Sequence, residues 1–378
     1  MQFIDLSIQQ KRIKTKIDKK IQEVLRHGQY IMGPEMFELE TALAEFTGVK
    51  YALSCSSGTD ALLMALMAFK VGPGDAVFTT PFTFIATAEV ISLLGATPVF
   101  VDIRADTFNI DFTKLKQTLE DFEKHNQAKK LKPKGIITVD LFGLPADYDE
   151  IGLIARQYDL FVIEDAAQSY GAQYHGKKAG SFGDIACTSF FPAKPLGGYG
   201  DGGMCFTNQN DLNQFMVSLR NHGQGDHRYE NVRIGINGRL DTLQAAILLC
   251  KFDIFPQEIE MRQEVAQRYS FLLSETSLKT PVIPERMVSA WAQYSVLAEN
   301  YTQRQMLLEK LKEFNIPTSV YYPKPLHLQK AFAPLKYKAG EFPVSEDCAE
   351  RIFSLPMHPY LEAEDQQRIA DAIKDALR

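Results

Sequence analysis

Ser189-Phe-Phe-Pro-Ala-Lys194-Pro-Leu-Gly-Gly-Tyr-Gly-Asp-Gly-Gly203 carries a single lysine between two prolines, with a cluster of glycines behind it. Pro192 and Pro195 fix the backbone φ angle and lack amide donors, so the stretch predicts a stiff, non-helical turn that holds Lys194. The glycines allow the backbone to pass close to a bound group or to another chain. A lysine held in this way can place its amine at one point, as a lysine that forms a Schiff base must. Taken alone, the stretch is equally compatible with a surface lysine in a glycine-rich turn.

A segment upstream, Phe161-Val-Ile-Glu-Asp165-Ala-Ala-Gln168, predicts a buried parallel strand that ends in a carboxylate. Ligands of open α/β sheets bind at the carboxyl ends of the strands. Pyridoxal phosphate needs a lysine for covalent attachment, an acidic partner for its pyridine nitrogen and a cradle for its phosphate. Lys194 and Asp165 meet the first two needs.

The candidate for the phosphate cradle is Ser56-Ser57-Gly58-Thr59-Asp60, between a predicted strand at 51–54 and an apolar helix at 61–69. Ser57 and Asp60 have the spacing of a capping box. Small residues at a helix start leave free N–H groups aimed at one point, which suits a phosphate. An ordinary helix cap explains these residues equally well in isolation, and the presence of Lys194 and Asp165 favours the phosphate site.

These motifs, in this order, resemble those of the nucleotide-sugar aminotransferases of the DegT/DnrJ/EryC1/StrS family. The resemblance runs over nearly the whole chain, from Phe3-Ile-Asp-Leu6 to Ser354-Leu-Pro-Met-His-Pro359. It implies an α/β protein, a fold-type I pyridoxal-phosphate-dependent transferase like aspartate aminotransferase. Some family members have histidine in place of the lysine and carry out dehydration, and Lys194 argues against that activity here.

The resemblance also implies roles for single residues. Lys194 is the catalytic nucleophile and proton carrier, and Asp165 is the catalytic partner of the pyridine nitrogen. Further cofactor contacts are implied for Gly58, Thr59 and Ser189 at the phosphate, Phe84 at the ring face, Gln168 at the phenolic oxygen, and Asn237 at the phosphate in the partner subunit. Substrate contacts are implied for Gly33, Arg239, Tyr321 and His327.

Without the resemblance, several of these residues have plainer explanations. An aromatic residue such as Phe84 after a strand is most often part of the core. The stretch around Gly33 reads as a linker, and Gly235-Ile-Asn237-Gly-Arg239-Leu-Asp241 reads as a loop that caps a helix. The family implies that this last segment crosses a two-fold dimer interface, so the expected assembly is a homodimer with shared active sites.

The expected substrate is a nucleotide-linked keto sugar, with glutamate as the amino donor. Arg26-His-Gly-Gln-Tyr-Ile-Met-Gly33 and Tyr321-Tyr-Pro-Lys-Pro-Leu-His327 are similar to the branch that aminates C3 of the sugar. This favours UDP-2-acetamido-3-keto-glucuronate, and a role in bacterial surface polysaccharide (lipopolysaccharide O-antigen) biosynthesis. A dTDP-linked 3-keto-6-deoxy sugar ranks second and 4-keto sugars third. The non-enzymatic alternative is a pyridoxal-phosphate-binding sensor or regulator, which would need a recognition module or a basic surface.

Composition narrows the remaining classes of protein. A length of 378 residues predicts two domains, a large cofactor-binding domain at 1–250 and a small C-terminal α/β domain at 251–378. The net charge of -6 leaves no basic footprint for nucleic acid. The five cysteines form no CxxC pair and the histidines are scattered, so neither a disulfide framework nor a metal site is expected. Because no signal peptide or membrane-length apolar run is present, we expect a cytoplasmic protein without a membrane partner.

Alternating strand and helix patterns between 51 and 165 predict a mostly parallel sheet with helices on both faces. Past 255 the pattern restarts in the smaller unit. We expect helices there at 262–276, 304–314, 345–353 and 362–377, and strands at 290–297 and 318–321. Gly171-Ala-Gln-Tyr-His-Gly176-Lys177 has P-loop spacing but lacks the Ser or Thr that must follow, and Gly198–203 matches GxGxxG without opening a helix. Both are expected to be turns.

Overall fold

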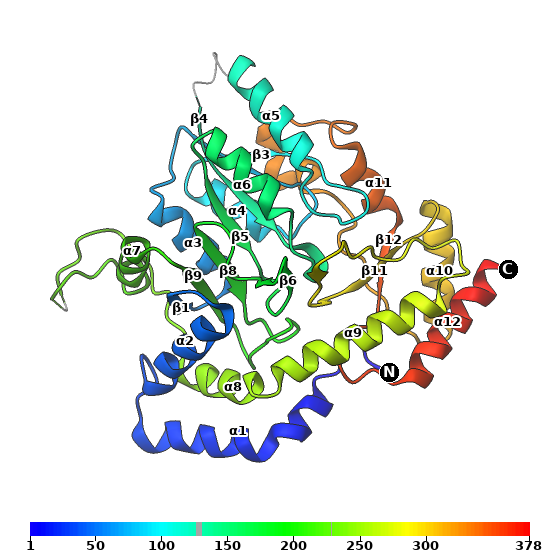
Figure 1. The fold of residues 1–378 in the computed structure, drawn as a ribbon, viewed down its shortest axis with the longest axis horizontal. Helices are drawn as coiled ribbons and strands as arrows, with labels where there is room; N and C mark the ends of the chain where they lie inside the picture. Colours follow the sequence, from blue (N-terminus) through cyan, green and yellow to red (C-terminus); the bar gives the residue numbers. More distant parts are fainter. Residues whose placement is uncertain (126–130, 228) are drawn as a thin grey trace.

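A seven-stranded sheet forms the centre of the molecule (Figure 1). The computed structural model describes residues 1–125, 131–227 and 229–378. The strand order is β1-β9-β8-β5-β4-β2-β3, and only the pairings made by β9 are antiparallel. The strands are β1 (Tyr51–Cys55), β2 (Asp75–Thr79), β3 (Thr97–Phe100), β4 (Lys132–Val139), β5 (Phe161–Asp165), β8 (Ile185–Ser189) and β9 (Gly203–Thr207). The predicted mostly parallel sheet is therefore confirmed.

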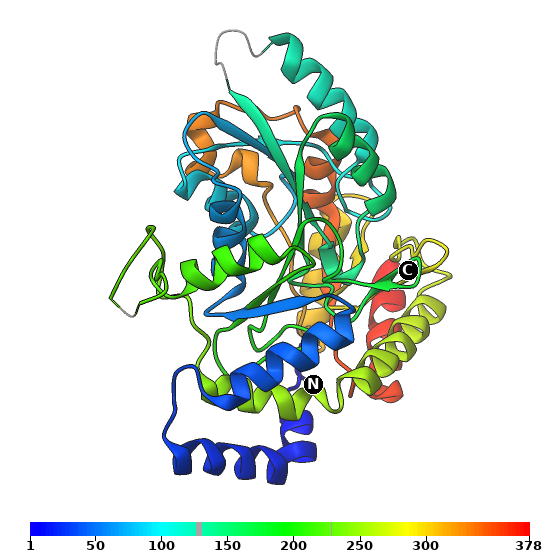
Figure 2. The ribbon, with the colours of Figure 1, turned by 60° about the vertical axis from the view of Figure 1, so that its left-hand side comes forward.

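Both faces of the sheet are covered because successive residues of its strands point to opposite sides. Ile136 and Val162 join one apolar core, whereas their neighbours Ile137 and Ile163 join another. The first core is closed by α5 (Phe112–His125) and α6 (Tyr148–Gln157), and the second by α3 (Gly58–Ala68), α4 (Ala86–Leu93) and α7 (Asn210–Arg220). The segment that follows α7 extends away from the body of the molecule (Figures 1 and 2).

A further layer of helices packs beside β8 and β9, formed by α1 (Ser7–His27), α2 (Pro34–Thr47) and α8 (Thr242–Phe252). Its core includes Met36, Leu39 and Leu248, against Met204 and Phe206 of β9. Short elements complete this part of the chain: η2 (Leu141–Gly143), β6 (Gln173–Tyr174) and β7 (Lys177–Lys178). The stretch with P-loop spacing is thus the turn between β6 and β7, as predicted.

The C-terminal part has an apolar core of its own, built from residues between Val265 and Ile373. It contains a two-stranded antiparallel sheet of β11 (Tyr294–Leu297) and β12 (Ile352–Leu355). Its other elements are α9 (Phe255–Leu272), β10 (Met287–Val288), α10 (Tyr301–Glu313), η3 (Leu326–Leu328), η4 (Lys330–Leu335), α11 (Pro343–Arg351) and α12 (Ala363–Leu377). Helix α9 contributes Phe255 to the core around α2 and Tyr269 to the C-terminal core. The division of the chain after residue 250 stays a prediction.

Several predicted elements in this part were wrong. The strand expected at 318–321 is only an isolated bridge between Ser319 and Ser354. The helix expected at 345–353 ends at Arg351, because Ile352 and Phe353 belong to β12 and pair with β11. A short apolar run is compatible with either helix or strand. Here the pairing with a distant strand decides the outcome, since Leu355 lies opposite Tyr294, 61 positions earlier in the chain. β8, β9 and α7 were not predicted.

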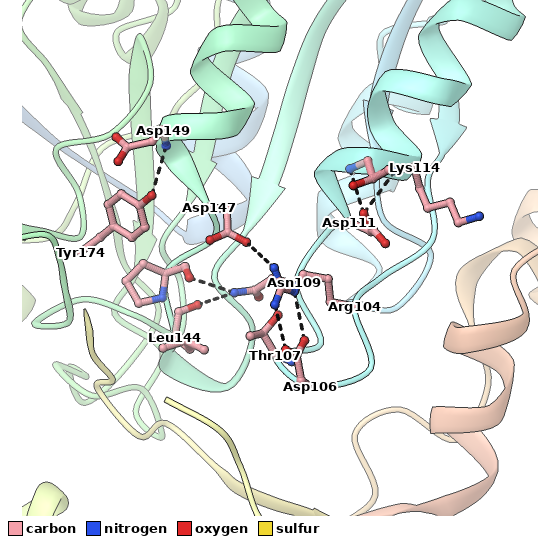
Figure 3. A network of polar contacts seen from close by, with 12 residues as sticks. Arg104, Asp106, Thr107, Asn109, Asp111, Lys114, Leu144, Asp147, Asp149 and Tyr174 are labelled. Atoms are coloured by element: carbon pink, nitrogen blue, oxygen red, sulfur yellow. Dashed lines mark hydrogen bonds and ion pairs between the residues drawn. The ribbon is translucent and has the colours of Figure 1, made fainter. Parts of the chain in front are cut away.

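Polar contacts tie together the loops that follow β3 and β4 (Figure 3). Arg104 donates to Asp106 at 2.8 Å and to Asp147 at 3.2 Å. The amide of Asn109 donates to the carbonyls of Leu144 and Pro145 at 2.9 and 3.0 Å. The two loops therefore form one ordered edge at the carboxyl ends of the strands.

The same edge is joined to the C-terminal part through Asp102. Its carboxylate is 7% exposed and accepts hydrogen bonds from the backbone N–H groups of Val344 and Ser345, both at 2.9 Å, and from the Ser345 hydroxyl at 2.6 Å. These donors lie in the first turn of α11, whose N–H groups have no partner within the helix. A residue in the loop after β3 thus caps a helix of the C-terminal part.

We expect Asp102→Ala to lower the free energy of unfolding by about 1–3 kcal/mol, because it leaves buried helix-end donors unsatisfied. The measurement is urea denaturation followed by circular dichroism. Asp111→Ala is the matched control, since Asp111 accepts from the N–H groups of Thr113 and Lys114 at 2.8 and 3.2 Å at a more open position. A loss no larger than that of the control would contradict the assigned role of Asp102.

Candidate active site

The carboxyl ends of β1, β5 and β8 meet at one edge of the sheet, and β9 begins there. Gly203 of β9 pairs with Cys55 on one side and with Ser189 on the other. Asp165 at the end of β5 pairs with Cys187 of β8. The three predicted motifs therefore converge, because each one follows a strand of the same parallel set.

The first motif forms the N-terminal end of α3. Ser57 is the N-cap, and its Oγ accepts the N–H of Asp60 at 3.0 Å. The N–H of Ala61 is taken by the carbonyl of Ser57 at 3.0 Å. The N–H groups of Gly58 and Thr59 remain without a helical acceptor, at the positive end of the helix dipole. The predicted cap is confirmed, and its geometry suits an anion.

Glycine at this corner lets two backbone segments approach more closely than a side chain would allow. A Cβ atom on Gly58 would lie 2.7 Å from the Cβ of Ser189. A Cβ on Gly203 would lie 2.4 Å from the carbonyl oxygen of Ser57. The close packing brings the N–H groups at the start of α3 next to Ser189, and these N–H groups with the Ser189 hydroxyl are a donor set that fits a phosphate.

Lys194 stands on the turn that was predicted for it. Its N–H donates to the carbonyl of Phe191 at 2.9 Å, and the strands of the turn are held by Phe190, which donates to Gly202 at 2.8 Å and accepts from Gly198 at 2.7 Å. Burial lowers the pKa of the Lys194 amine, while the charge of Asp165 acts in the opposite direction. Lowering this pKa enlarges the neutral fraction of the amine, which is the nucleophilic form.

Asp165 is 6% exposed. One carboxylate oxygen accepts from the Thr87 hydroxyl at 2.9 Å, and the other accepts from the N–H of Ala167 at 3.2 Å. Burial raises the pKa of Asp165, and these two donors and Lys194 oppose that rise. The carboxylate is therefore a buried acceptor beside a buried amine.

Gln168 links the sheet edge to the C-terminal part. Its Oε1 accepts from the N–H of Phe142 at 2.7 Å, so its Nε2 is turned toward the Tyr322 hydroxyl, 3.3 Å away. The ring of Phe84 lies 6.5 Å from that of Tyr322 and is 55% exposed. An exposed phenylalanine beside Gln168 and Tyr322 is free to contact a flat ligand.

Tyr322 and Thr87 are the residues that sequence reasoning missed. Tyr322 lies in the stretch quoted for the substrate loop, where Tyr321 was chosen instead. The Tyr321 ring packs against Phe3 of the N-terminal segment, with centroids 6.3 Å apart. Nothing in the local sequence distinguishes the two tyrosines. Thr87, three residues after Phe84, could have been recognised from the sequence as a hydroxyl donor to the carboxylate of Asp165.

Two predicted substrate residues have structural partners instead of open surfaces. His327 was expected in the substrate mouth but is 2% exposed, with Nε2 3.1 Å from Glu346. Gly33 is buried at the start of α2, and its N–H donates to Thr242 at 3.0 Å. Both residues shape the loops around the site, and direct contact with substrate stays a prediction for each.

Asn237 and Arg239 lie together at the side of the phosphate motif. The Nε of Arg239 donates to the Asn237 side chain at 2.9 Å, and the carbonyl of Gly238 accepts from the N–H of Ser56 at 3.0 Å. Asn237 is exposed. Within the described residues of this single chain, neither side chain has a hydrogen bond to Lys194 or Asp165, so their site roles stay predictions.

The fold and the motifs at the sheet edge define a protein of the aminotransferase class. The sequence profile of the DegT/DnrJ/EryC1/StrS aminotransferase family matches residues 11–374, and the chain belongs to this family. It is 50% identical over 373 residues to UDP-2-acetamido-2-deoxy-3-oxo-D-glucuronate aminotransferase of Pseudomonas aeruginosa, covering 99% of each chain. It is 42% identical over 376 residues to a protein of Geobacillus stearothermophilus called pleiotropic regulatory protein, covering 100% of this chain and 98% of that one.

Solved structures give the same result. A DegT DnrJ EryC1 StrS aminotransferase from Brucella abortus superimposes with a TM-score of 0.95 and 48% identity, over 100% of this chain and 99% of that one. A Bacillus subtilis protein with bound cofactor PMP superimposes with a TM-score of 0.89 and 27% identity, over 99% and 83% of the two chains. The protein is an aminotransferase with pyridoxal phosphate as its cofactor.

Two negative findings apply to the described parts of the chain. Between residues 1 and 378, leaving out 126–130 and 228, no group of three or more His, Cys, Asp or Glu side chains is arranged to hold a metal ion. Over the same residues, no helix is both long and apolar enough to cross a membrane.

Reduction of the protein with borohydride should fix pyridoxal phosphate irreversibly to Lys194, because this amine stands on the rigid turn beside Asp165. Peptide mass mapping is the measurement. Lys177 and Lys178, in the β6–β7 hairpin, serve as internal controls and should remain unmodified. An adduct on either of them would overturn the placement of the reaction centre.

Proposed function

We propose that this protein transfers an amino group from glutamate to C3 of UDP-2-acetamido-2-deoxy-3-oxo-glucuronate. The observation that carries the proposal is the 50% identity, over 99% of both chains, to the Pseudomonas aeruginosa enzyme of that name. The products would be 2-oxoglutarate and a 2,3-diamino uronic acid on UDP. The sugar is of a kind suited to surface polysaccharide biosynthesis.

Bound pyridoxal phosphate supplies an electrophilic carbon and a ring that takes up negative charge. Lys194 offers a neutral amine at one fixed point and can then carry a proton between neighbouring carbons. The Asp165 carboxylate holds the pyridine nitrogen in its protonated form. The N–H groups of Gly58 and Thr59 and the Ser189 hydroxyl hold the phosphate.

Gln168 and Phe84 position the ring from its edge and its face. The amide of Gln168 has one N–H left for the phenolic oxygen, since its other N–H points to the Tyr322 hydroxyl and its oxygen accepts from Phe142. Phe84 is exposed at the site and can stack on the pyridine ring. Arg239 is the candidate partner for the uronate carboxylate, with Tyr321 beside the sugar.

The alternatives differ in substrate or in class. dTDP-linked 3-keto-6-deoxy sugars and 4-keto sugars would use the same site residues. A regulatory role, suggested by the name of the Geobacillus stearothermophilus relative, would leave Lys194 and Asp165 without a catalytic purpose. A panel of UDP- and dTDP-linked keto sugars, with glutamate and detection of 2-oxoglutarate, separates these cases. Turnover with a neutral keto sugar but not with the uronate would reject the proposed substrate.

Asp165→Asn should reduce kcat by about two to three orders of magnitude, because the amide keeps the shape but cannot stabilise a protonated pyridine nitrogen. Single-turnover kinetics and the content of bound cofactor are measured together. Asp184→Asn is a control for the loss of a carboxylate. The Asp184 side chain lies away from the site, where it accepts from the N–H of Val162. Near-normal turnover of Asp165→Asn with cofactor bound would show that another acid serves the ring.

We further propose a two-fold dimer in which each Asn237 reaches the cofactor phosphate in the partner subunit. Asn237 is exposed in the single chain. The hydrogen bond from the N–H of Ser56 to the carbonyl of Gly238 holds the segment that carries Asn237 next to the phosphate motif. Ile234 and Tyr229, in the segment that follows α7, have exposed apolar side chains that a second copy of the protein would cover in the dimer.

Mixing inactive Lys194→Ala chains with Asn237→Asp chains tests this arrangement. The introduced carboxylate repels the phosphate, so shared sites place both defects in one site of a mixed dimer and leave the other intact. Random mixing should then restore about a quarter of wild-type activity, since half of the dimers are mixed and each has one complete site. No recovery, in mixtures shown to exchange subunits, would mean that each chain builds its own site. An active monomer in sedimentation would also refute sharing.

A further inference from the structure

The carboxylate of Asp165 is bound by a pair of threonines that no motif assigned. Thr83 lies in the loop before α4 and Thr87 in the first turn of α4, and they are 3% and 0% exposed. The Thr87 hydroxyl lies 2.9 Å from Oδ2 of Asp165, and the Thr83 hydroxyl lies 3.2 Å from that of Thr87. The three side chains therefore form a continuous chain of hydrogen bonds that leads to the carboxylate.

The number of protons decides which group donates in each of these hydrogen bonds. A hydroxyl has one proton to donate, whereas an ionised carboxylate can only accept. Thr87 must therefore donate to Asp165, and its own oxygen is left to accept from Thr83. With the N–H of Ala167 on the other carboxylate oxygen at 3.2 Å, both oxygens of the ionised form have a donor.

This arrangement also orients the carboxylate. Two donors from different elements, one on α4 and one in the loop after β5, restrict rotation of the Asp165 side chain. The lone pairs that they leave free are those available to a ligand between β5 and the Lys194 turn. A hydrogen bond to a charged acceptor is among the stronger ones in proteins.

We propose that Thr87, supported by Thr83, is a positioning residue that keeps Asp165 ionised and turned toward the pyridine nitrogen of the cofactor. The proposal rests on the role proposed above for Asp165. Thr87 acts through that carboxylate and is not itself a catalytic residue.

Other titratable groups face Asp165 from the surrounding elements. Lys194 is the cation among them, and its charge also favours the ionised carboxylate. Cys187 on β8 and Tyr322 from the C-terminal part are its other neighbours, and burial raises the pKa of both. Both stay neutral around pH 7, so they do not replace the donor that Thr87 supplies.

Removing the Thr87 hydroxyl should weaken the hold of Asp165 on the ring proton. The ionised carboxylate loses a charge-assisted hydrogen bond, so protonation of Asp165 becomes easier and its attraction for a protonated ring nitrogen falls. The proton shared between Asp165 and the ring nitrogen therefore moves toward the carboxylate, and the protonated fraction of the ring nitrogen at neutral pH falls below that in the wild-type protein.

The experiment compares Thr87→Val, which keeps the shape, with Thr87→Ser, which keeps the hydroxyl. Thr79→Val is the matched control, because Thr79 is also fully buried but donates to the carbonyl of Ile137 at 2.9 Å. Each protein is reconstituted with pyridoxal phosphate carrying ¹⁵N in the ring, and the ¹⁵N chemical shift is followed with pH. The dissociation constant of the cofactor from each apoprotein is measured separately by equilibrium dialysis.

We expect Thr87→Val to shift the partition of the proton from the ring nitrogen toward Asp165 by about tenfold, the scale of one charge-assisted hydrogen bond, seen as a ¹⁵N chemical shift closer to that of a neutral pyridine at neutral pH. The dissociation constant of the cofactor should rise about tenfold. Thr87→Ser should stay close to wild type in both measurements, as should Thr79→Val. In turnover, kcat of Thr87→Val should fall while KM for the keto sugar changes little.

Asp165→Asn, measured in parallel, tests the role of Asp165 separately from the positioning role of Thr87. If Asp165→Asn lowers the protonated fraction of the ring nitrogen but Thr87→Val behaves like Thr79→Val, the positioning role is overturned while the site assignment stands. If Asp165→Asn leaves the ring unchanged, the assigned role of Asp165 falls, and the inference falls with it. If Thr87→Val does not fold, Thr83→Val must give a smaller shift in the same direction, and no shift overturns the proposal.

Discussion

A buried negative charge at the end of β5 is the constraint around which the active site is arranged. Taking a carboxylate out of water is costly unless donors or a cation replace the lost solvation. Asp165 obtains them from three separate elements: Thr87 of α4, the N–H of Ala167 in its own loop, and the amine of Lys194 on the turn after β8. Each of these elements must be in place for the charge to be tolerated. The parallel order of the sheet puts them there, because it gathers the carboxyl ends of β2, β5 and β8 at one edge.

Two further buried acids, Asp140 and Glu164, hold the loops next to this edge of the sheet. Asp140 accepts from the Ser169 hydroxyl at 2.7 Å and from the Tyr148 hydroxyl at 2.7 Å, while Glu164 accepts from the N–H groups of Gly180 and Phe182. Burial raises the pKa of Asp140 to about 6 and also raises the pKa of Glu164 well above its ordinary value. Ionisation of two adjacent buried carboxyl groups is unfavourable, and the charge of Asp140 adds to the rise in the pKa of Glu164. The pair fixes the loop that carries Gln168, because Asp140 binds the hydroxyl of the adjacent Ser169.

The C-terminal part closes the site at several points. Tyr322 reaches Gln168, the N–H of Leu326 donates to the carbonyl of Pro81 at 2.8 Å, and α11 is capped by Asp102. The loop between Tyr322 and Leu326 is therefore held at both ends against the carboxyl edge of the central sheet. Such a loop can line the space beside the cofactor while the sheet holds the reactive groups.

The sequence alone determined the parts of this protein that depend on local chemistry. A lysine between prolines, an aspartate at the end of an apolar strand and small residues before a helix each specify their own backbone, and Lys194, Asp165 and Gly58 lie where those patterns predicted. The tertiary structure decided what depends on partners far along the chain. It turned Tyr322 rather than Tyr321 toward Gln168, buried His327 against Glu346, gave Asp165 the hydroxyl of Thr87, and made a strand of Ile352–Leu355. The direction in which a loop side chain points, and the partner that satisfies a buried charge, are set by long-range packing, which no local pattern encodes.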